Sequence, residues 1–291
     1  ATSSSGSQSP GVRIFDGASG EEIAKKVTDM TWRSCSADAA WHAFSTLNRV
    51  RIVEIDSDKT VNEFELPVYP EDPTGNHSVH VAKLSHGGDL LATTGRNADR
   101  VWDVAVHVWD VNSGELRCTL EGFQEQVTSF SWMPGDAMVA TVSKNGPIRF
   151  WNAATGKQEF NLVDADDPLL SFSISPDGSR LAIVTESGRC RMWEIATRAF
   201  IHSFAVFPGG CGWPVWSPDG RVLAIGTAHG TVQLHSAEDG RLLGTFMTWR
   251  NGPLVAFSAG GHFRINGQQP KVQDELLYVV ETDAGSLLTL D

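Results

Sequence analysis

The residues of this chain that could do chemistry are few and scattered. Asp164, Asp166 and Asp167 form the densest group of carboxylates, and Ca²⁺ prefers six to eight oxygen ligands of this kind. The three aspartates follow a predicted strand and precede Pro168, so we assign them to a solvated loop rather than to a metal site. Nine histidines are dispersed along the chain, and most stand singly on predicted strands.

Sequence motifs of catalysis are also absent. The chain has no Gly-x-Ser-x-Gly elbow, no His-Glu-x-x-His pattern and no Gly-rich phosphate loop, which are the patterns that mark hydrolases, zinc peptidases and nucleotide-binding enzymes. The sequence therefore predicts no catalytic residue, no metal site and no cofactor.

Short strands separated by turns must position any site, and they are clearest in residues 169–205. Leu170, Phe172 and Ile174 alternate with serines, the period of two that buries one face of a strand. The turn Ser175-Pro176-Asp177-Gly178 follows, because Pro presets its own φ and Gly tolerates a positive one. Three further strands are predicted, at 180–185, 189–195 and 199–205.

The same pattern recurs 42 residues upstream and 42 residues downstream. Upstream, Trp151 takes the place of Trp193. Downstream, Ser217-Pro218-Asp219-Gly220 repeats the first turn. A four-strand repeat of this length in register is typical of the blades of a β-propeller, an all-β fold.

The repeats resemble those of the WD40 family, in the form with a Ser-Pro-Asp-Gly turn that is common in bacterial proteins. Val108-Trp109-Asp110, Phe150-Trp151-Asn152 and Met192-Trp193-Glu194 stand where that family has its Trp-Asp ending. The family's Gly-His pair and the Asp before the third strand are missing from the clear repeats, and His235 replaces Trp in the fifth. These departures bear on the family's buried His-Ser-Asp-Trp hydrogen-bond network rather than on the blade.

Counting strands predicts a propeller of six blades. Two strands in 11–27, twenty in five full repeats and three at the end total about 25, whereas six four-stranded blades need 24 and seven need 28. The hairpin 11–27 is expected to complete the last blade beside 254–258 and 276–281 and so to close the ring. Seven blades, the commoner number in the family, are the alternative.

Composition separates a short N-terminal segment from one domain and excludes two classes of partner. Residues 1–10 are rich in Ser, Gly and Gln and predict a disordered linker or tag remnant, and residues 11–291 predict a single WD40-like propeller. The net charge is −12 and no basic stripe is present, so we expect no nucleic-acid partner. No apolar run reaches the roughly 20 residues that cross a bilayer, so we expect no membrane partner.

Four cysteines lie in four different repeats, with no two close together in sequence: Cys35, Cys118, Cys190 and Cys211. Metal and redox motifs need two such residues a few positions apart. We expect separate thiols in a reducing, cytoplasmic compartment, with a disulfide between Cys190 and Cys211 as the alternative.

One surface is predicted to bind a partner. The resemblance implies that the loops joining second to third strands, and fourth strands to the next repeat, lie on one face. An insertion of six residues falls in one of these loops, within 95–104. Aromatic and Arg side chains anchor protein interfaces, although each aromatic could instead pack on a neighbouring blade. The candidates are Arg96, Trp102, Phe123, Lys144, Phe207, Trp249 and Arg250.

These observations predict a non-catalytic scaffold that binds a protein or a carboxylate-bearing peptide through that loop face, within a larger bacterial regulatory protein. A six-bladed metal-dependent hydrolase or dehydrogenase is the first alternative, but its inner strands would have to supply acidic and His ligands. The predicted inner strands 128–131, 170–174 and 254–258 supply mostly Ser, Thr and apolar residues. A purely structural spacer is the second alternative.

The alignment also predicts which side chains are buried between blades. They are the large apolar residues at equivalent positions of successive repeats: Phe130, Trp151, Phe172, Trp193, Leu181 and Leu223.

Overall fold

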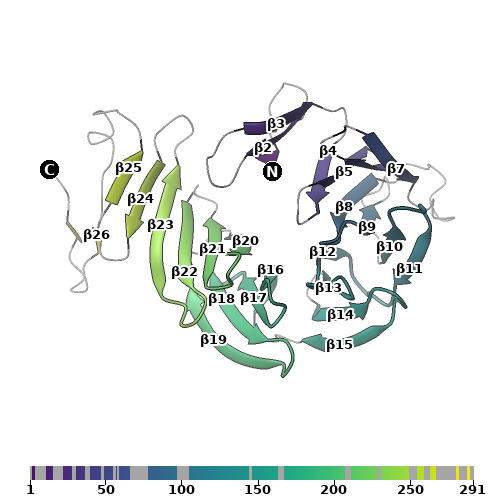
Figure 1. Cartoon of the computed structure of the whole chain (residues 1–291). Helices are drawn as coiled ribbons and strands as arrows, with labels where there is room; N and C mark the ends of the chain where they lie inside the picture. The colour runs from purple at the N-terminus through teal and green to yellow at the C-terminus, as the bar shows by residue number, and fades with distance from the viewer. Residues whose placement is uncertain are drawn as a thin grey trace. The chain divides into compact units, whose positions relative to one another are not determined.

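The computed structural model describes strands and the turns that join them (Figure 1). No helix occurs among the described residues, so the all-β prediction is confirmed there. The chain divides into an N-terminal body, Ala1–Asp164, and a C-terminal body, Ala165–Asp291. The described residues are 2–3, 11–15, 22–27, 31–36, 40–46, 49–54, 57, 59–65, 78–96, 105–143, 146–162, 167–206, 211–227, 231–248, 254–258, 263–266, 280–281 and 287–288.

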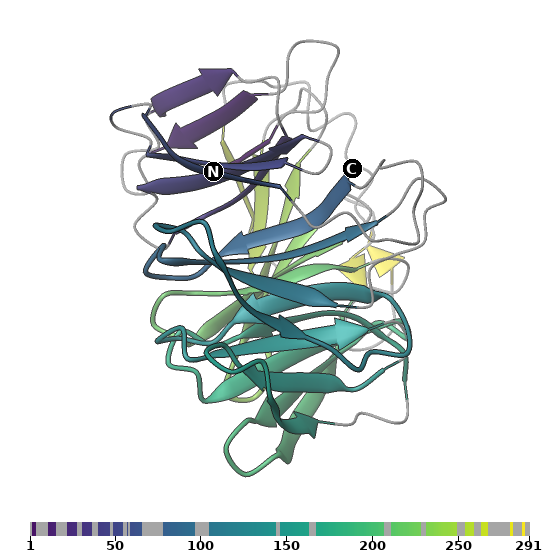
Figure 2. The same ribbon diagram turned by 90° about the vertical axis from the view of Figure 1, so that its right-hand side faces the viewer.

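The N-terminal body holds one three-stranded sheet and three four-stranded antiparallel sheets, each with its strands in chain order (Figure 1, Figure 2). The first sheet contains β1 (Thr2–Ser3), β2 (Gly11–Phe15) and β3 (Glu22–Val27). The others contain β4 (Thr31–Cys35), β5 (Trp41–Thr46), β6 (Arg49–Glu54) and β7 (Lys59–Glu65); β8 (Ser78–Leu84), β9 (Leu90–Arg96), β10 (Val106–Asp110) and β11 (Leu116–Leu120); and β12 (Val127–Trp132), β13 (Met138–Ser143), β14 (Ile148–Asn152) and β15 (Gln158–Leu162).

The C-terminal body holds a four-stranded, a six-stranded and a two-stranded sheet. The four-stranded sheet contains β16 (Leu169–Ile174), β17 (Arg180–Thr185), β18 (Arg189–Glu194) and β19 (Ala199–Ala205). The six-stranded sheet contains β20 (Cys211–Trp216), β21 (Val222–Thr227), β22 (Thr231–Ser236), β23 (Leu242–Thr248), β24 (Leu254–Ser258) and β25 (Phe263–Asn266). The last two strands are β26 (Val280–Glu281) and β27 (Leu287–Leu288).

The pairing of the last strands differs from the predicted ring closure. Strand β24 was expected to begin a new blade, but it pairs antiparallel with β23 and so extends the fifth repeat. The hairpin β2–β3 pairs with β1, and no described strand joins it to β24. Most of the predicted strand 276–281 lies outside the described residues.

The first turn of the fourth repeat shows why Ser-Pro-Asp-Gly folds as it does. Gly178 has a φ of 73°, a conformation that residues with a Cβ adopt at a cost. Its N–H donates to the Ser175 carbonyl at 2.9 Å, and the Ser175 hydroxyl accepts the N–H of Arg180 at 2.8 Å. The hydroxyl of Ser175 also donates to Asp177, and this bond leads the causes that lower the pKa of Asp177 to about 2.

A β-bulge recurs in the fourth strand of every full repeat. In the third repeat the register shifts between Phe150 and Trp151, which leaves Glu159 as the extra residue of β15. The same shift leaves Ile201 extra in β19 and Leu243 extra in β23. A bulge twists its strand and interrupts the edge of the sheet at that point.

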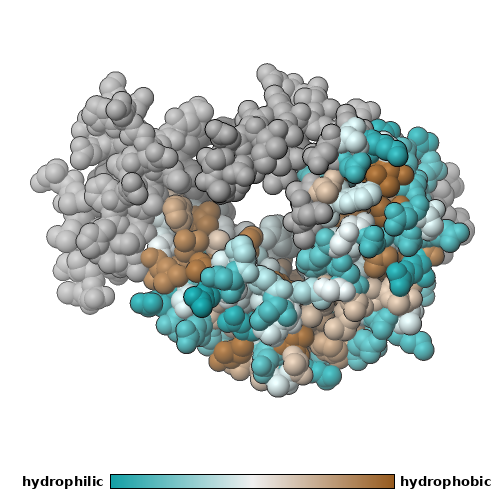
Figure 3. All heavy atoms as spheres, viewed as in Figure 1, coloured by the Kyte–Doolittle hydropathy of each residue, from teal (hydrophilic) through white to brown (hydrophobic). Residues whose placement is uncertain are grey.

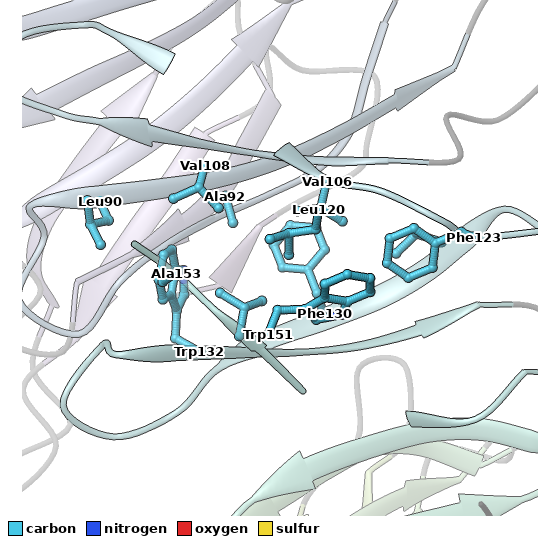
Figure 4. Packing of buried hydrophobic residues seen from close by; sticks show 12 residues of the cluster. Leu90, Ala92, Val106, Val108, Leu120, Phe123, Phe130, Trp132, Trp151 and Ala153 are labelled. Carbon is cyan, nitrogen blue, oxygen red and sulfur yellow. The ribbon is translucent and has the colours of Figure 1, made fainter. Parts of the chain in front are cut away.

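The core is divided into clusters that join neighbouring sheets within a body. One cluster lies between the β8–β11 and β12–β15 sheets and includes Val108, Leu120, Phe130 and Trp151 (Figure 4). A second joins β4–β7 to β8–β11, and a third joins β16–β19 to β20–β23. Burial is confirmed for five of the six predicted core residues. It is wrong for Trp193, which is partly exposed.

Candidate interaction surface

The strand registers place the ends of certain strands together. In the second repeat, Ser78 at the start of β8 pairs with Arg96 at the end of β9, and Val106 at the start of β10 pairs with Leu120 at the end of β11. The third repeat is built in the same way. We call this the loop end of a sheet: the end where its first and third strands begin and its second and fourth strands end.

For six of the seven predicted contact residues, the side chain lies outside the part of the chain that the structure describes. Arg96 is the last residue of β9, at the loop end, but its side chain lies outside the described residues. The described ends of β13, β19 and β23 lie at the loop ends of their own sheets. Five residues that follow second strands or fourth strands lie outside the described part of the chain altogether: Trp102, Lys144, Phe207, Trp249 and Arg250.

The seventh, Phe123, is a packing residue, and its prediction as an exposed contact is wrong. Its side chain is only 7% exposed, and its ring centroid lies 5.0 Å from that of Trp151. The Arg149 guanidinium lies 5.2 Å from the centre of the Phe123 ring and donates to the Gly122 carbonyl at 2.7 Å. Phe123 therefore attaches the β11–β12 loop to the next sheet (Figure 4).

The resemblance implies a buried hydrogen-bond network around the third-strand Trp, and in two repeats the structure contains one bond of this kind, between Trp and Thr. The Trp109 indole donates to the Thr93 hydroxyl at 2.9 Å, and the Trp151 indole donates to Thr141 at 2.8 Å. In the fourth repeat Ile183 occupies the position of Thr141. The Trp193 indole nitrogen is buried there without a hydrogen-bond partner among the described residues.

In the fifth repeat His235 takes the place of Trp. Its Nδ1 lies 3.0 Å from the Gly240 carbonyl, and burial lowers its pKa. The imidazole therefore bonds to a turn of its own hairpin instead of to the second strand.

At the end opposite the loop end, Asp136 joins the third repeat to the second. Its carboxylate accepts the backbone N–H groups of His86 at 2.9 Å and Gly87 at 2.8 Å, and lies 2.9 Å from Nδ1 of His86. Burial alone raises the pKa of Asp136, but these hydrogen bonds outweigh it and hold the pKa below its ordinary value. The sequence signal, which was missed, is the order Gly135-Asp136 where the fourth and fifth repeats have Asp-Gly.

Arg180 makes the corresponding connection in the C-terminal body with different chemistry. Its guanidinium donates to the Gly220 carbonyl at 2.9 Å and to the Ala237 carbonyl at 3.3 Å. It also lies 5.2 Å from the centre of the Trp216 ring, within the range of a cation–π contact. Both connections bind the first turn of one repeat to a neighbouring repeat.

Lys83, on the first strand β8, is a second group that sequence reasoning missed. Burial lowers the pKa of its amine to about 8, and Nζ lies 5.9 Å from the centre of the Phe130 ring. The described residues contain no group of three or more His, Cys, Asp or Glu side chains arranged to hold a metal ion.

Asp167, the one described member of the aspartate triplet, lies in a bend before β16. The Ser187 hydroxyl donates to the carboxylate of Asp167, and so does the Ser187 N–H at 3.4 Å. Asp164 and Asp166 lie outside the described residues, as does the side chain of Cys211. Cys190 is a buried thiol that forms no disulfide, so the alternative disulfide between Cys190 and Cys211 is wrong. Within the described part of the chain, no helix has the length and apolar character needed to span a membrane.

Comparison with protein families gives two matches along the chain. Residues 114–152 match the model of the WD domain, G-beta repeat, and residues 215–258 match that of the Anaphase-promoting complex subunit 4 WD40 domain. Both matched segments contain turns and strands described above.

Among curated proteins, the chain is similar to Coronin-7. The mouse protein (Mus musculus) is 31% identical over 83 residues, which are 28% of this chain and 8% of that protein. The human protein (Homo sapiens) is 34% identical over 88 residues, which are 29% of this chain and 9% of that protein. The matched segment thus spans less than a tenth of these relatives.

Among solved structures, the β-propeller domain of Cps50 (Swd1) from Myceliophteria thermophila is similar, with a TM-score of 0.62. The match covers 82% of this chain and 85% of that domain at 13% sequence identity. At this identity the likeness concerns the fold alone, and that fold is a β-propeller.

Proposed function

We propose that this chain is a non-catalytic module that binds a protein or peptide through the loop end of its sheets. Support comes from the match of residues 114–152 to the WD domain model and from the likeness to a β-propeller domain. WD40 propellers generally act as interaction scaffolds. The observation that carries the proposal is the register that gathers the ends of β9, β11 and β13 at one end of their sheets. The long insertion within 95–104 starts from that end.

The ligand that we propose carries carboxylates. Arg96, Lys144 and Arg250 provide cationic groups in these segments, and Arg pairs with carboxylates through two parallel hydrogen bonds. Trp102, Phe207 and Trp249 are the proposed anchors, since large aromatic side chains dominate the energy of protein interfaces. Phe123 is excluded from this set because it is buried.

The test is a variant in which Arg96, Trp102, Trp249 and Arg250 are replaced by Ala. It should keep the melting temperature of the parent and lose capture of the partner in a pull-down. The matched control is Arg221→Ala with Arg241→Ala, because both residues are exposed in turns at the opposite end of their sheet. Loss of folding in the fourfold variant, or binding equal to that of the parent, would overturn the proposal.

The same proposal includes a single propeller of six blades over residues 11–291, in a cytoplasmic bacterial regulatory protein. The strand count supports six blades, and the likeness to one propeller domain over 82% of the chain supports a single ring. If the hairpin 11–27 closes that ring, deletion of residues 1–27 should lower the melting temperature, whereas deletion of residues 1–10 should not. Equal melting temperatures would contradict the closure.

A further inference from the structure

The fourth strands of the five full repeats differ in whether they carry charged residues that would discourage another strand from pairing with their outer edge. Three of them carry charged residues: Lys59, Glu63 and Glu65 in β7, Arg117 in β11, and Glu159 in β15. Charges on an edge strand discourage another strand from pairing with it. Strands β19 and β23 contain no Lys, Arg, Asp or Glu.

One of the two uncharged edges is covered by a strand. Strand β24 pairs antiparallel with β23 along Gly244–Thr248, beginning directly after the bulged residue Leu243. The equivalent part of β19 begins at His202, directly after its own bulged residue Ile201. Strand β19 is the last strand of its sheet, and no described strand pairs with its outer edge.

The surface beside β19 is apolar and cationic. Phe200 is 48% exposed and Ile201 is 44% exposed. Figure 3 shows hydrophobic residues among hydrophilic ones at the lower margin, where Figure 1 labels β19. The Arg191 guanidinium lies 5.5 Å from the centre of the Phe200 ring.

Arg189, on β18, extends to the neighbouring strand β19, where its Nη2 donates to the Ser203 hydroxyl at 2.6 Å. Residues 189–205 hold three arginines and one acidic residue, Glu194. The Glu194 carboxylate already accepts the Thr197 hydroxyl at 2.5 Å. Asp167, outside this segment, also interacts electrostatically with Arg191. Three arginines therefore face two carboxylates, and the edge keeps a small positive excess in a chain whose net charge is −12.

We propose that β19 is a second docking site, separate from the loop end, which takes an extended acidic segment of another protein. The segment adds antiparallel to β19 along His202–Ala205, as β24 adds to β23. Backbone hydrogen bonds then provide affinity and side chains provide specificity. Apolar side chains of the segment contact Phe200 and Ile201, and its carboxylates meet Arg189 and Arg191.

The probe is a fluorescent peptide, Glu-Leu-Val-Ala-Phe-Ser-Glu, which places the β24 sequence between two glutamates. Its binding to the full chain is measured by fluorescence anisotropy, and its position by hydrogen exchange of backbone amides. We expect saturable binding with protection confined to β19. A peptide with Lys in place of both glutamates should bind at least tenfold more weakly, and so should one with Pro in place of Ala.

Two substitutions copy the guarded edges of other repeats and should therefore fold normally. Ile201→Glu reproduces the bulged residue of β15, and Ile201→Arg reproduces that of β11, Arg117. We expect Ile201→Glu to weaken binding of the probe more than tenfold, and Ile201→Arg to weaken it less, because Arg keeps the charge complementary to the peptide. Leu170→Glu, at an exposed position of the first strand β16, is the control and should bind as the parent does.

Several outcomes would overturn the proposal. They are protection elsewhere than β19, equal affinity of the Glu and Lys peptides, and undiminished binding by Ile201→Glu. Protection of β19 that depends on protein concentration without peptide, together with a dimer in sedimentation, would assign the edge to a second copy of this chain. Failure of the fourfold loop-end variant would leave these results unchanged, since the two sites share no residue.

Discussion

The indole N–H of Trp151 donates to the hydroxyl of Thr141 at 2.8 Å, from the third strand of a sheet to its second. A buried donor that loses its acceptor costs about 1–3 kcal/mol. Thr141→Val keeps the shape of the side chain and removes the acceptor. We expect it to lower the free energy of unfolding by about 1–3 kcal/mol, measured by urea denaturation. In a Trp151→Phe background the same substitution should cost much less, and an equal cost in both backgrounds would contradict the assignment.

The fourth repeat offers the reverse experiment, because Ile183 takes the register position of Thr141. Each lies on the second strand, two residues after the residue that pairs with the third-strand Trp. Buried hydroxyls without a partner normally make Thr less stable than Val. At position 183, Thr would supply the acceptor that the buried Trp193 indole lacks among the described residues. We therefore expect Ile183→Thr to unfold at a urea concentration no lower than Ile183→Val. A clear advantage for Val would show that the indole is satisfied in another way.

Asp136 predicts how stability falls in acid. Its pKa is lower in the folded chain than in the unfolded one, so its contribution is present above the unfolded value of about 4 and is lost as the pH falls through the folded value. Asp136→Asn keeps a residue that tolerates the φ of 59° but removes the charge. We expect a loss of about 1–3 kcal/mol at pH 7, which shrinks as the pH falls below the unfolded value of about 4 and through the lower folded value. A loss that stays constant with pH would contradict a role for the carboxylate charge.

Lys83 predicts the opposite limb of the pH profile. Because burial lowers its pKa to about 8 from 10.5, the unfolded chain binds more protons between these values. The free energy of unfolding should rise with pH across this interval. Lys83→Met should be more stable than the parent at pH 7, and the difference should decrease from pH 8 to pH 10.5. Denaturation curves at pH 7, 9 and 10.5 measure this, with Lys157→Met, an exposed lysine, as the control.

Phe123 separates packing from binding. Phe123→Ala removes a ring that lies against Trp151, and truncation of a buried Phe costs about 3–5 kcal/mol. We expect a lower melting temperature with no specific loss of partner capture at temperatures where the variant is folded. A variant that melts like the parent would show that the ring contributes little to the core.

The sequence was sufficient for the repeats because each strand and turn is specified locally. Alternation fixed the buried face at Phe130 and Phe172, and the Ser-Pro-Asp-Gly turns were specified by residues within four positions of one another. The same local reasoning could not find the connection between Asp136 and Gly87, because it depends on how one repeat meets the next. The same reasoning was wrong for Phe123, because a loop residue between two sheets can be buried by a residue that is distant in sequence, here Trp151.

The prediction for Trp193 was wrong for a related reason. Its alignment with Trp151 is correct, as both face the second strand at equivalent register positions. Burial of the third-strand Trp depends, however, on which side chains of the neighbouring sheet and of the fourth strand contact it. In β19 the residue that contacts Trp193 is Phe200, whose ring lies edge-on to the indole with a centroid distance of 5.5 Å. Whether a loop-end residue is exposed or buried depends on the same kind of long-range packing, which local sequence patterns do not encode.

The contacts between repeats that Asp136 makes in one body and Arg180 makes in the other respond differently to acid. The hydrogen bonds that a carboxylate accepts from N–H groups weaken when the carboxylate is protonated. A guanidinium that donates to carbonyls keeps its charge at any pH at which the chain folds. Acid strong enough to protonate Asp136, at a pH below the ordinary value of about 4, should therefore loosen the contact between the second and third repeats, while the contact between the fourth and fifth repeats holds. Two contacts formed at equivalent turns of similar repeats would then differ in their resistance to acid.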